Sequence, residues 1–347
     1  MYIKRILLTI VLAGIVAAGI FSYYVYKTIF LPNTSFENET AFVLVSSDRS
    51  YQEVRQQLVP LLKNIESFDK VAQKKGYVAN VKPGKYAIKK GMNNNDIVNS
   101  LRSKNIPIQI SFNNQERLAN LAGRIAEQIE ADSLSLLQKI TDETYLVQNG
   151  FNSENGLNLF IPNTYEFYWN SSAETFRDRM LTEYNRFWNE QRLKKASQLG
   201  LSPHQVMNLA AIVQKETARV DERPRVAGVY LNRLRVGMLL QADPTVIFAI
   251  KKETGDFDTV IKRVLFKDLE IDSPYNTYKY PGIPPGPISM PDISSIEAVL
   301  NPEKHDYFYF VADVSNPGYH LFAKSLAQHN RNRQQYIKWI NKQGINR

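Results

Sequence analysis

The sequence predicts an α+β protein in which an N-terminal transmembrane helix precedes a small α/β module and a larger mixed α+β domain. Three observations lead to this prediction. Residues 6–25 form an uncharged apolar run that is long enough to cross the hydrocarbon core of a membrane. Residues 41–105 alternate short strand and helix patterns, and residues 106–347 combine several helical patterns with isolated strands. We therefore expect boundaries after residues 30, 40 and 105, with the polar stretch 31–40 as a linker.

The ends of the apolar run indicate its orientation. Lys4 and Arg5 precede it, and an aromatic and basic collar follows it, made of Tyr23, Tyr24, Tyr26 and Lys27. Because basic residues stay on the cytoplasmic side, we expect a single-pass protein of the cell (inner) membrane whose larger domain lies outside the cytoplasm. A cleaved signal peptide is the alternative, since Ala17, Ala18 and Gly19 are small. The length of the run and the aromatic collar favour the anchor.

Composition excludes several kinds of site. The 347 residues include no cysteine, which excludes disulfides, thiol nucleophiles and thiolate metal sites. The four histidines lack metal-ligand spacing, so we expect neither a metal nor a cofactor. The net charge of +9 comes from dispersed basic residues without a nucleic-acid-binding motif. We therefore expect no nucleic-acid partner, and a basic surface suits anionic lipid headgroups equally well.

The expected elements of the small module are a strand at 42–45, helices at 51–65 and 68–74, a turn and strand at 81–88, and a helix at 92–101. The larger domain is expected to begin with a strand at 106–112. Helices at 113–130 and 133–141, an irregular connection at 142–154 and a long helix at 172–199 follow it. After a stiff Pro/Gly-rich loop at 273–288, the pattern predicts a helix at 294–300, a hairpin of 307–311 with 319–322, and a closing helix at 325–342.

Glu216 is the central candidate residue. Ser202 and Pro203 mark a helix start, after which one helical face carries Val206, Leu209, Val213 and Glu216. Three of these are apolar, so the carboxyl is carried toward the core near the negative end of the helix. Both effects favour the protonated form and raise its pKa, as a general acid requires. The alternative is a solvated surface glutamate, the common fate of helix glutamates.

Polar residues gather close to this helix in the sequence. Asn232, Arg233, Gln241, Asp243 and Thr245 interrupt otherwise apolar text around a Gly237 turn and an Asp243-Pro244 helix start. Asn276 and Tyr278 lie on the Pro/Gly-rich loop, whose stiff backbone suits the wall of a groove. The pattern indicates a polar pocket lined by several elements.

These motifs resemble those of a known family. The runs I-V-Q-K-E-T, V-A-G-V-Y-L-N-R-L and L-Q-A-D-P-T-V-I resemble the core of the bacterial endolytic murein transglycosylases (the MltG or YceG-like family). Y-N-T-Y at 275–278, G-I-P-P-G-P-I at 282–288, Y-F-Y-F-V at 307–311 and the late H-N at 329–330 are similar as well. The resemblance runs from about residue 42 to the C-terminus. Residues 160–169 resemble the P-D-T-Y element of that family with Asn163 in place of Asp, and Leu157 and Asn158 stand where many relatives have an acidic residue and a glycine.

The resemblance implies a lyase that cleaves the bond between N-acetylmuramic acid and N-acetylglucosamine in peptidoglycan glycan strands and leaves 1,6-anhydro ends. It implies that Glu216 acts alone, first as acid and then as base. Asp221 and Glu222 do not share its helical face, and Asp243 is farther along the chain. The expected substrate-binding residues are Gln241, Asp243, Thr245, Asn232, Asn276 and Tyr278. Action on nascent strands, which would terminate their elongation, is a further implication, and membrane-bound peptidoglycan synthases are open as partners.

Two alternatives remain open at this stage. The chain could be a membrane-tethered glycan-binding scaffold for wall synthases with weak catalysis, or a plain hydrolase that makes muramidase products. Residues 83–101 are similar to the LysM-like module of these transglycosylases, so residues 41–105 are expected either to contact glycan or to act as a spacer.

Overall fold

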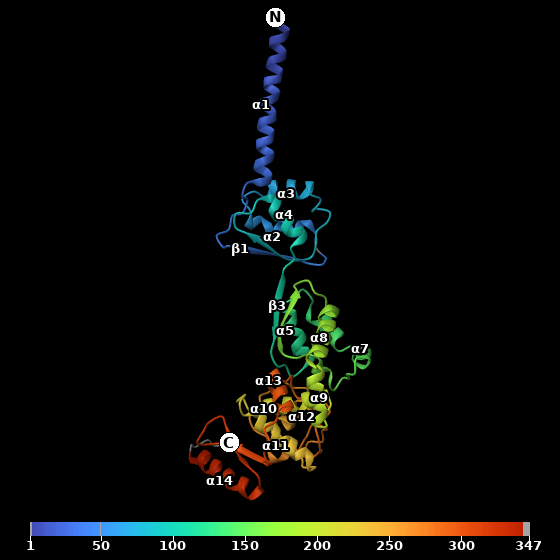
Figure 1. Cartoon of the computed structure of the whole chain (residues 1–347), viewed down its shortest axis with the longest axis vertical. Coiled ribbons are helices and arrows are strands. Elements are labelled where there is room, and N and C mark those ends of the chain that lie inside the picture. The colour runs from blue at the N-terminus through green and yellow to red at the C-terminus, as the bar shows by residue number, and fades with distance from the viewer. Residues whose placement is uncertain (1, 49, 343–347) are drawn as a thin grey trace. The chain divides into compact units, whose positions relative to one another are not determined.

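The computed structural model describes residues 2–48 and 50–342, and its contacts divide the chain into two compact units (Figure 1). The N-terminal unit contains the chain up to residue 110 together with residues 128–131 and 165–172. The C-terminal unit contains residues 111–127, 132–164 and the chain from 173 onward. Helices and three two-stranded sheets occur among the described residues, which confirms the α+β class.

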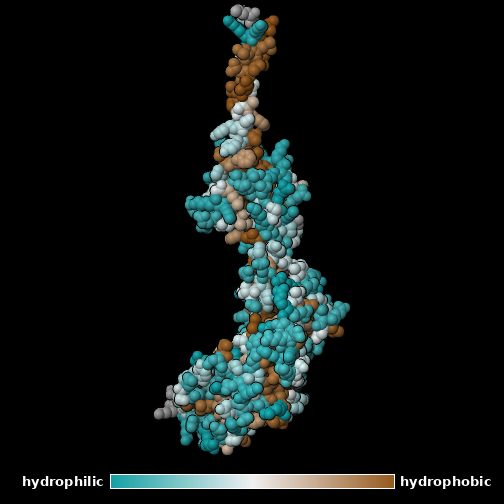
Figure 2. All heavy atoms as spheres, viewed as in Figure 1, coloured by the Kyte–Doolittle hydropathy of each residue, from teal (hydrophilic) through white to brown (hydrophobic). Residues whose placement is uncertain are grey.

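The first helix, α1 (Tyr2–Phe30), is the only described helix that is long and apolar enough to cross a membrane. Its most apolar window has a mean hydropathy of 2.4, and none of its residues is buried. Figure 2 shows the hydrophobic surface along it. Near the end of the helix, the Thr28 carbonyl accepts a hydrogen bond of 2.8 Å from the Asn94 side chain. The predicted apolar helix is therefore present and attached to the module that follows.

That module pairs β1 (Thr40–Val45) antiparallel with β2 (Gly84–Lys89) and packs three helices against them, namely α2 (Tyr51–Leu58), α3 (Ile65–Lys74) and α4 (Asn94–Ser103). The small α/β unit is as expected, and its likeness to a LysM module stays a prediction. The helix predicted at 51–65 is wrong in length. It ends at Leu58 and a 3₁₀ turn, η1 (Val59–Leu61), follows, because Pro60 has no amide hydrogen to continue the helical bonds.

The stretch predicted as a linker is bound into the same module. Asn33 is buried, and its side chain donates to Asn94 Oδ1 at 2.7 Å and accepts from the Asn64 amide at 2.9 Å. Thr34 is buried as well, and its hydroxyl accepts a bond from the Gly91 amide. Composition alone suggested a free connection, but these bonds tie it to both α3 and α4.

The chain from residue 107 onward contains the sheet of β3 (Pro107–Phe112) and β4 (Asn163–Tyr168), and the hairpin of β5 (Tyr309–Ala312) and β6 (His320–Ala323). Its other elements are α5 (Leu118–Ala126), α6 (Ser133–Ile140), α7 (Glu143–Gln148), η2 (Gly156–Leu159), α8 (Ala173–Phe187), α9 (Glu190–Gln198), α10 (Pro203–Glu216), α11 (Arg223–Arg235), α12 (Asp243–Thr254), η3 (Phe266–Glu270), α13 (Ile293–Leu300) and α14 (Leu326–Lys342).

Three expectations for this part of the chain were wrong. The helix predicted at 113–130 covers only α5, because residues 113–117 form a loop whose Glu116 is held by Lys215 and Lys251. The connection predicted at 142–154 contains α7, which Asp142 caps. The helix predicted at 172–199 is two helices, since Asn189 takes an extended conformation and caps α9 through the Arg192 amide.

Helix α10 lies at the centre of the C-terminal unit and contacts α9, α11, α12, α13 and η2. Val206, Leu209 and Val213 are fully buried, as their spacing predicted. Met207, Ala211 and Ile212, on the other sides of the helix, are buried too. The helix is therefore enclosed on all sides rather than amphipathic. This packing fixes the helix, and with it the polar groups at its C-terminal end.

Gly228 allows α11 to approach the segment that follows α13. A Cβ atom at this position would lie 2.6 Å from the Glu303 carbonyl oxygen and 2.7 Å from His305 Nε2. We expect Gly228→Ala to destabilise the fold by about 1–3 kcal/mol, because a backbone atom must move to make room. Gly123→Ala in α5 is the control, since no atom lies within 4 Å of its added Cβ. Thermal unfolding of both variants checks this, and equal melting temperatures would contradict it.

Candidate active site around Glu216

Glu216 is the last residue of α10. The helix starts at a capping box formed by Ser202 and Gln205 with Pro203 in the first turn, and it ends because Thr217 is extended. The carboxyl thus projects at the negative end of a buried helix, where ionisation is disfavoured. Glu216 itself is partly exposed, so a ligand can reach it.

Burial and neighbouring groups shift the pKa of Glu216 in opposite directions. Burial is the largest influence and raises the pKa of Glu216 to about 7, and the charge of Asp243 adds to the rise. A hydrogen bond of 2.8 Å from the Tyr230 hydroxyl and the charge of Arg233 partly oppose it. At neutral pH the group is therefore divided between acid and base, which suits a residue that must serve as both.

Helix α11 supplies the two groups that face Glu216. Tyr230 is buried, and burial raises the pKa of its hydroxyl well above the ordinary value, so it acts as a donor. Arg233, one turn later, donates to the Phe308 carbonyl at 2.7 Å and to the Leu240 carbonyl at 2.5 Å. The residue before strand β5 and the turn before α12 are thereby joined beside Glu216. Sequence reasoning did not single out Tyr230, although its position three residues before Arg233 places both on one face of the helix.

Asp243 and Tyr278 lie within the electrostatic range of Glu216, and the Tyr278 hydroxyl donates to Asp243 at 2.5 Å. Asp243 is exposed at the start of α12, and Tyr278 is partly exposed on the Pro/Gly-rich loop. The separation of Asp243 from Glu216 along the chain therefore did not indicate their separation in the folded protein. Folding brings a second carboxylate close to Glu216, although its hydrogen bond is to a tyrosine.

Gln241 is the only described residue other than glycine with a positive φ, at 48°. Its amide donates to the Thr277 carbonyl at 3.0 Å, and its side chain is exposed. A left-handed conformation costs a non-glycine residue about 1–2 kcal/mol, so the turn before α12 holds its shape against strain. Of the residues expected to bind substrate, Gln241 and Asp243 are exposed, and Tyr278 and Asn232 are partly exposed.

The other three expected substrate-binding residues use their side chains within the protein. Thr245 and Asn276 are fully enclosed, with Thr245 bonded to Thr277 and to the Ala242 carbonyl, and Asn276 bonded to the Leu269 and Ile271 carbonyls. Asn232 donates to the His305 and Tyr307 carbonyls at 2.8 and 3.1 Å. These side-chain bonds hold the walls of the site in place, and contact of the three residues with substrate stays a prediction.

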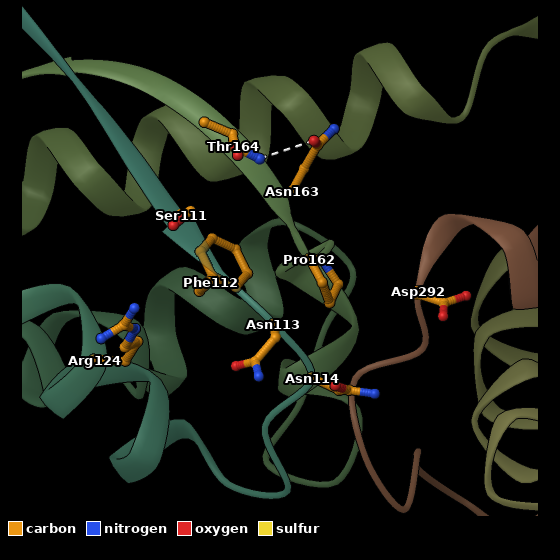
Figure 3. A pocket seen from close by; sticks show the side chains of 9 residues that line it. All are labelled: Ser111, Phe112, Asn113, Asn114, Arg124, Pro162, Asn163, Thr164 and Asp292. Atoms are coloured by element: carbon orange, nitrogen blue, oxygen red, sulfur yellow. Dashed lines mark hydrogen bonds between the residues drawn. The ribbon is translucent and has the colours of Figure 1, made fainter. Parts of the chain in front are cut away.

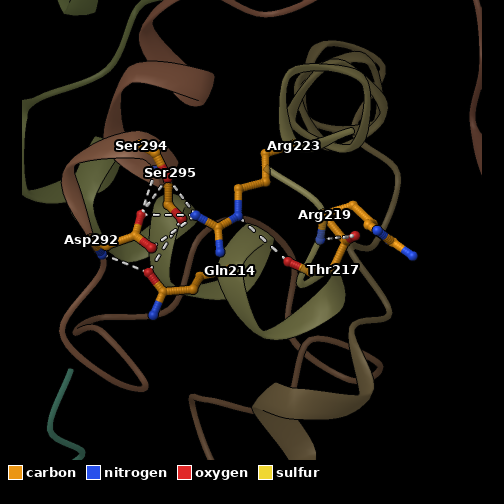
Figure 4. A network of polar contacts seen from close by, with 7 residues as sticks. All are labelled: Gln214, Thr217, Arg219, Arg223, Asp292, Ser294 and Ser295. Carbon is orange, nitrogen blue, oxygen red and sulfur yellow. Dashed lines mark hydrogen bonds and ion pairs between the residues drawn. The ribbon is translucent and has the colours of Figure 1, made fainter. Parts of the chain in front are cut away.

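A second polar network joins residues at the end of α10 to Arg223 and to the start of α13 (Figure 4). Buried Arg223 donates to both carboxyl oxygens of Asp292 at 2.9 and 2.8 Å, to the Ser294 hydroxyl and to the Thr217 carbonyl. Gln214 Oε1 accepts from the Asp292 amide at 2.5 Å. The residue that follows Glu216 is thus fixed to the start of α13.

The neighbouring acids of the motif have structural partners. Glu222 is buried and accepts bonds from the Thr217 hydroxyl at 3.0 Å and from the His320 amide at 2.8 Å, and it pairs with His320 Nδ1 at 2.8 Å. Asp221 accepts from the Tyr319 hydroxyl at 2.9 Å. Both carboxyls therefore attach the β5–β6 hairpin to the loop after Glu216. In the described part of the chain, no group of three His, Asp or Glu side chains is arranged to hold a metal ion.

The bond from Tyr230 predicts a shift in pH dependence. Its hydroxyl stabilises the ionised form of Glu216, so Tyr230→Phe should raise the pKa of Glu216 further above 7. A reaction that needs the protonated acid should then persist to higher pH than in the wild type. The check is the rate as a function of pH for both proteins. An alkaline limb that stays in place or moves to lower pH would contradict the arrangement.

Comparison with known proteins identifies the family of this chain. A model of the YceG-like family matches residues 43–335. The endolytic murein transglycosylase of Bacillus subtilis is 32% identical over 296 residues, which cover 80% of this chain and 79% of that protein. That of Streptococcus pneumoniae is 27% identical over 94% of this chain and 64% of that protein, so the chain spans just under two thirds of the pneumococcal relative. A crystal structure of a yceG-like protein from Listeria monocytogenes has a TM-score of 0.57 at 29% identity and covers 85% of this chain and 99% of that chain. With a family match over most of its length, the chain belongs to the YceG-like family.

Proposed function

We propose that this protein is a membrane-anchored endolytic peptidoglycan lytic transglycosylase with Glu216 as its acid and base. The observation that carries the proposal is the single carboxyl at the end of a buried helix whose pKa burial raises to about 7. The names of the relatives from Bacillus subtilis and Streptococcus pneumoniae support the reaction class.

In the proposed reaction, protonated Glu216 gives its proton to the oxygen of the bond between N-acetylmuramic acid and N-acetylglucosamine. As that bond breaks, positive charge develops on the sugar ring, where the 2-acetamido group stabilises it. The Glu216 carboxylate then removes the proton of the C6 hydroxyl, whose oxygen closes the 1,6-anhydro ring. Attack within the same sugar benefits from a high effective concentration, and no water is consumed. Tyr230 steadies the carboxylate between the two proton transfers.

Hydrolysis is a second candidate because Asp243 lies within electrostatic range of Glu216, and most glycosidases use two carboxylates. Mass spectrometry of the products from purified glycan strands separates the candidates. A transglycosylase releases ends that are one water lighter than those of a hydrolase. Hydrolytic ends as the main product would reject the proposed reaction, and so would the absence of cleavage.

We place α1 across the cell (inner) membrane with the N-terminus in the cytoplasm, supported by its apolar surface and the preceding Lys4 and Arg5. Action on nascent strands, termination of their elongation and association with membrane-bound synthases would follow from that position. A reporter fused to the C-terminus should be active only outside the cytoplasm, with the protein retained in membranes after alkaline washing. A soluble mature chain that lacks its first residues would reject the anchor.

The module at residues 41–105 is proposed to contact the same glycan strand. Its removal, with α1 retained, should then reduce cleavage of polymeric glycan more than cleavage of short oligomers, because a second contact is lost only for long substrates. Equal reductions would instead favour a spacer.

A further inference from the structure

A pocket of about 580 Å³ lies in the C-terminal unit beside the end of α10 (Figure 3). Its walls come from the end of β3 and the loop after it, from α5, from the start of β4, and from Asp292 before α13. None of the residues predicted to bind substrate lines it. The proposed reaction therefore leaves this pocket without a role.

Neutral amide and hydroxyl groups dominate the lining. Exposed Asn113, Asn114, Asn163 and Thr164 contribute them, while buried Phe112 and partly buried Pro162 supply apolar surface. Asn163 Oδ1 accepts from the Thr164 amide at 2.8 Å (Figure 3). Such a mixture suits a ring with hydroxyl and acetamido groups, whose apolar parts need a wall and whose polar parts need donors and acceptors.

The two charged groups of the lining are already neutralised. Arg124 pairs with Glu127 at 2.7 Å. Asp292 pairs with Arg223 at 2.8 Å. An anionic ligand such as a peptide stem with free carboxyl groups would find no unpaired positive charge in these pairs. The pocket therefore favours an uncharged ligand.

Two of the pocket walls are attached directly to the last turn of α10. The Asp292 amide donates to Gln214 Oε1, two residues before Glu216. The loop that carries Asn113 and Asn114 continues to Glu116, which pairs with Lys215 at 2.8 Å. A helix rises about 1.5 Å per residue, so these attachments lie within one turn of the catalytic carboxyl.

We propose that this pocket binds an N-acetylated sugar of the same glycan strand, away from the bond that is cleaved. The proposal rests on the proposed function for the identity of the strand. It gives the enzyme a contact that only strands extending beyond the reaction centre can make, which favours cleavage within a strand over cleavage at its ends.

The test measures binding rather than cleavage. N-acetylglucosamine oligomers of increasing length, and glycan strands with and without peptide stems, are titrated calorimetrically against full-length Glu216→Gln protein. We expect affinity to increase about tenfold at the length that reaches the pocket, as two hydrogen bonds of ordinary net strength would give. Asn114→Ala with Asn163→Ala should abolish that increase, and so should the blocking variant Asn163→Trp. Asn185→Ala, at an exposed position in α8, should retain it.

Each outcome is decisive. Unchanged affinity of the pocket variants for long strands would overturn the proposal, as would an increase that appears only when stems are present. Failure of the wild type to form anhydro ends would overturn the proposed function alone, since the binding series does not depend on cleavage. Thermal melts establish that the exposed substitutions leave the fold intact.

Discussion

Replacing Glu216 with glutamine should lower the release of anhydro-ended fragments on the order of a thousandfold or more, since both proton transfers depend on this carboxyl. Glutamine keeps the size and can still accept the bond from Tyr230, so the fold should survive. Glu253→Gln, at an exposed position in α12, is the matched control and should act at the wild-type rate. Near-normal release by a folded Glu216→Gln protein would reject the mechanism.

The pH dependence of stability provides a second test of the raised pKa of Glu216. The pKa of Glu216 is raised from 4.5 to about 7 on folding. The folded state therefore holds the proton more tightly than the unfolded state, and stability is lost as pH rises through this interval. The full loss amounts to about 3 kcal/mol at 1.4 kcal/mol per pKa unit. Glu216→Gln should consequently be more stable than the wild type at pH 8 and equal to it at pH 4. Parallel stability profiles would contradict the raised pKa.

Replacing Arg223 with methionine should lower the free energy of unfolding by about 2–3 kcal/mol, because the arginine is buried, although its partner Asp292 is two-fifths exposed, and several groups lose their hydrogen-bond donor. The guanidinium is buried and joins Asp292, Ser294 and the Thr217 carbonyl, so its removal frees the start of α13 and the residue after Glu216. The control is Arg225→Met, two residues away. Its partner Glu303 and the arginine are each about two-fifths exposed, so that pair contributes less than about 1 kcal/mol.

The two arginine variants are compared by urea unfolding at neutral pH. Burial by itself would raise the pKa of Asp292, but bonds from Ser295, Arg223 and Ser294 outweigh it and leave that pKa lowered. The stability that this carboxylate contributes is present above its ordinary pKa and is lost as pH falls below it. The difference between the wild type and Arg223→Met should accordingly shrink in acid. If the two variants lost the same free energy of unfolding at neutral pH, burial of Arg223 would not determine the strength of its interactions.

Local signals were strong enough to predict much of the chain. The uncharged run after Lys4 and Arg5 predicted α1, and the Ser202 cap with Pro203 predicted the start of α10. The spacing of Val206, Leu209 and Val213 predicted their burial and carried Glu216 toward the core. These features depend on residues within a few turns of one another, and for that reason sequence alone reveals them.

Only the tertiary structure decided which polar side chains of these motifs are used for bonds within the protein. Thr245, Asn276 and Asn232 appear in the same motifs as Gln241 and Asp243, yet their side chains bond to carbonyls and hydroxyls that folding brings from distant segments.

The sequence by itself determined the fold class, the apolar helix, the family motifs and Glu216 as the candidate acid. Folding decided that Tyr230 and Asp243 act on that carboxyl, that Glu222 attaches to His320, and that residues 113–114 and 163–164 meet in a pocket. Local patterning follows from helix and strand periodicity, whereas the pKa of a group depends on burial and on charges that lie close only after the chain has folded.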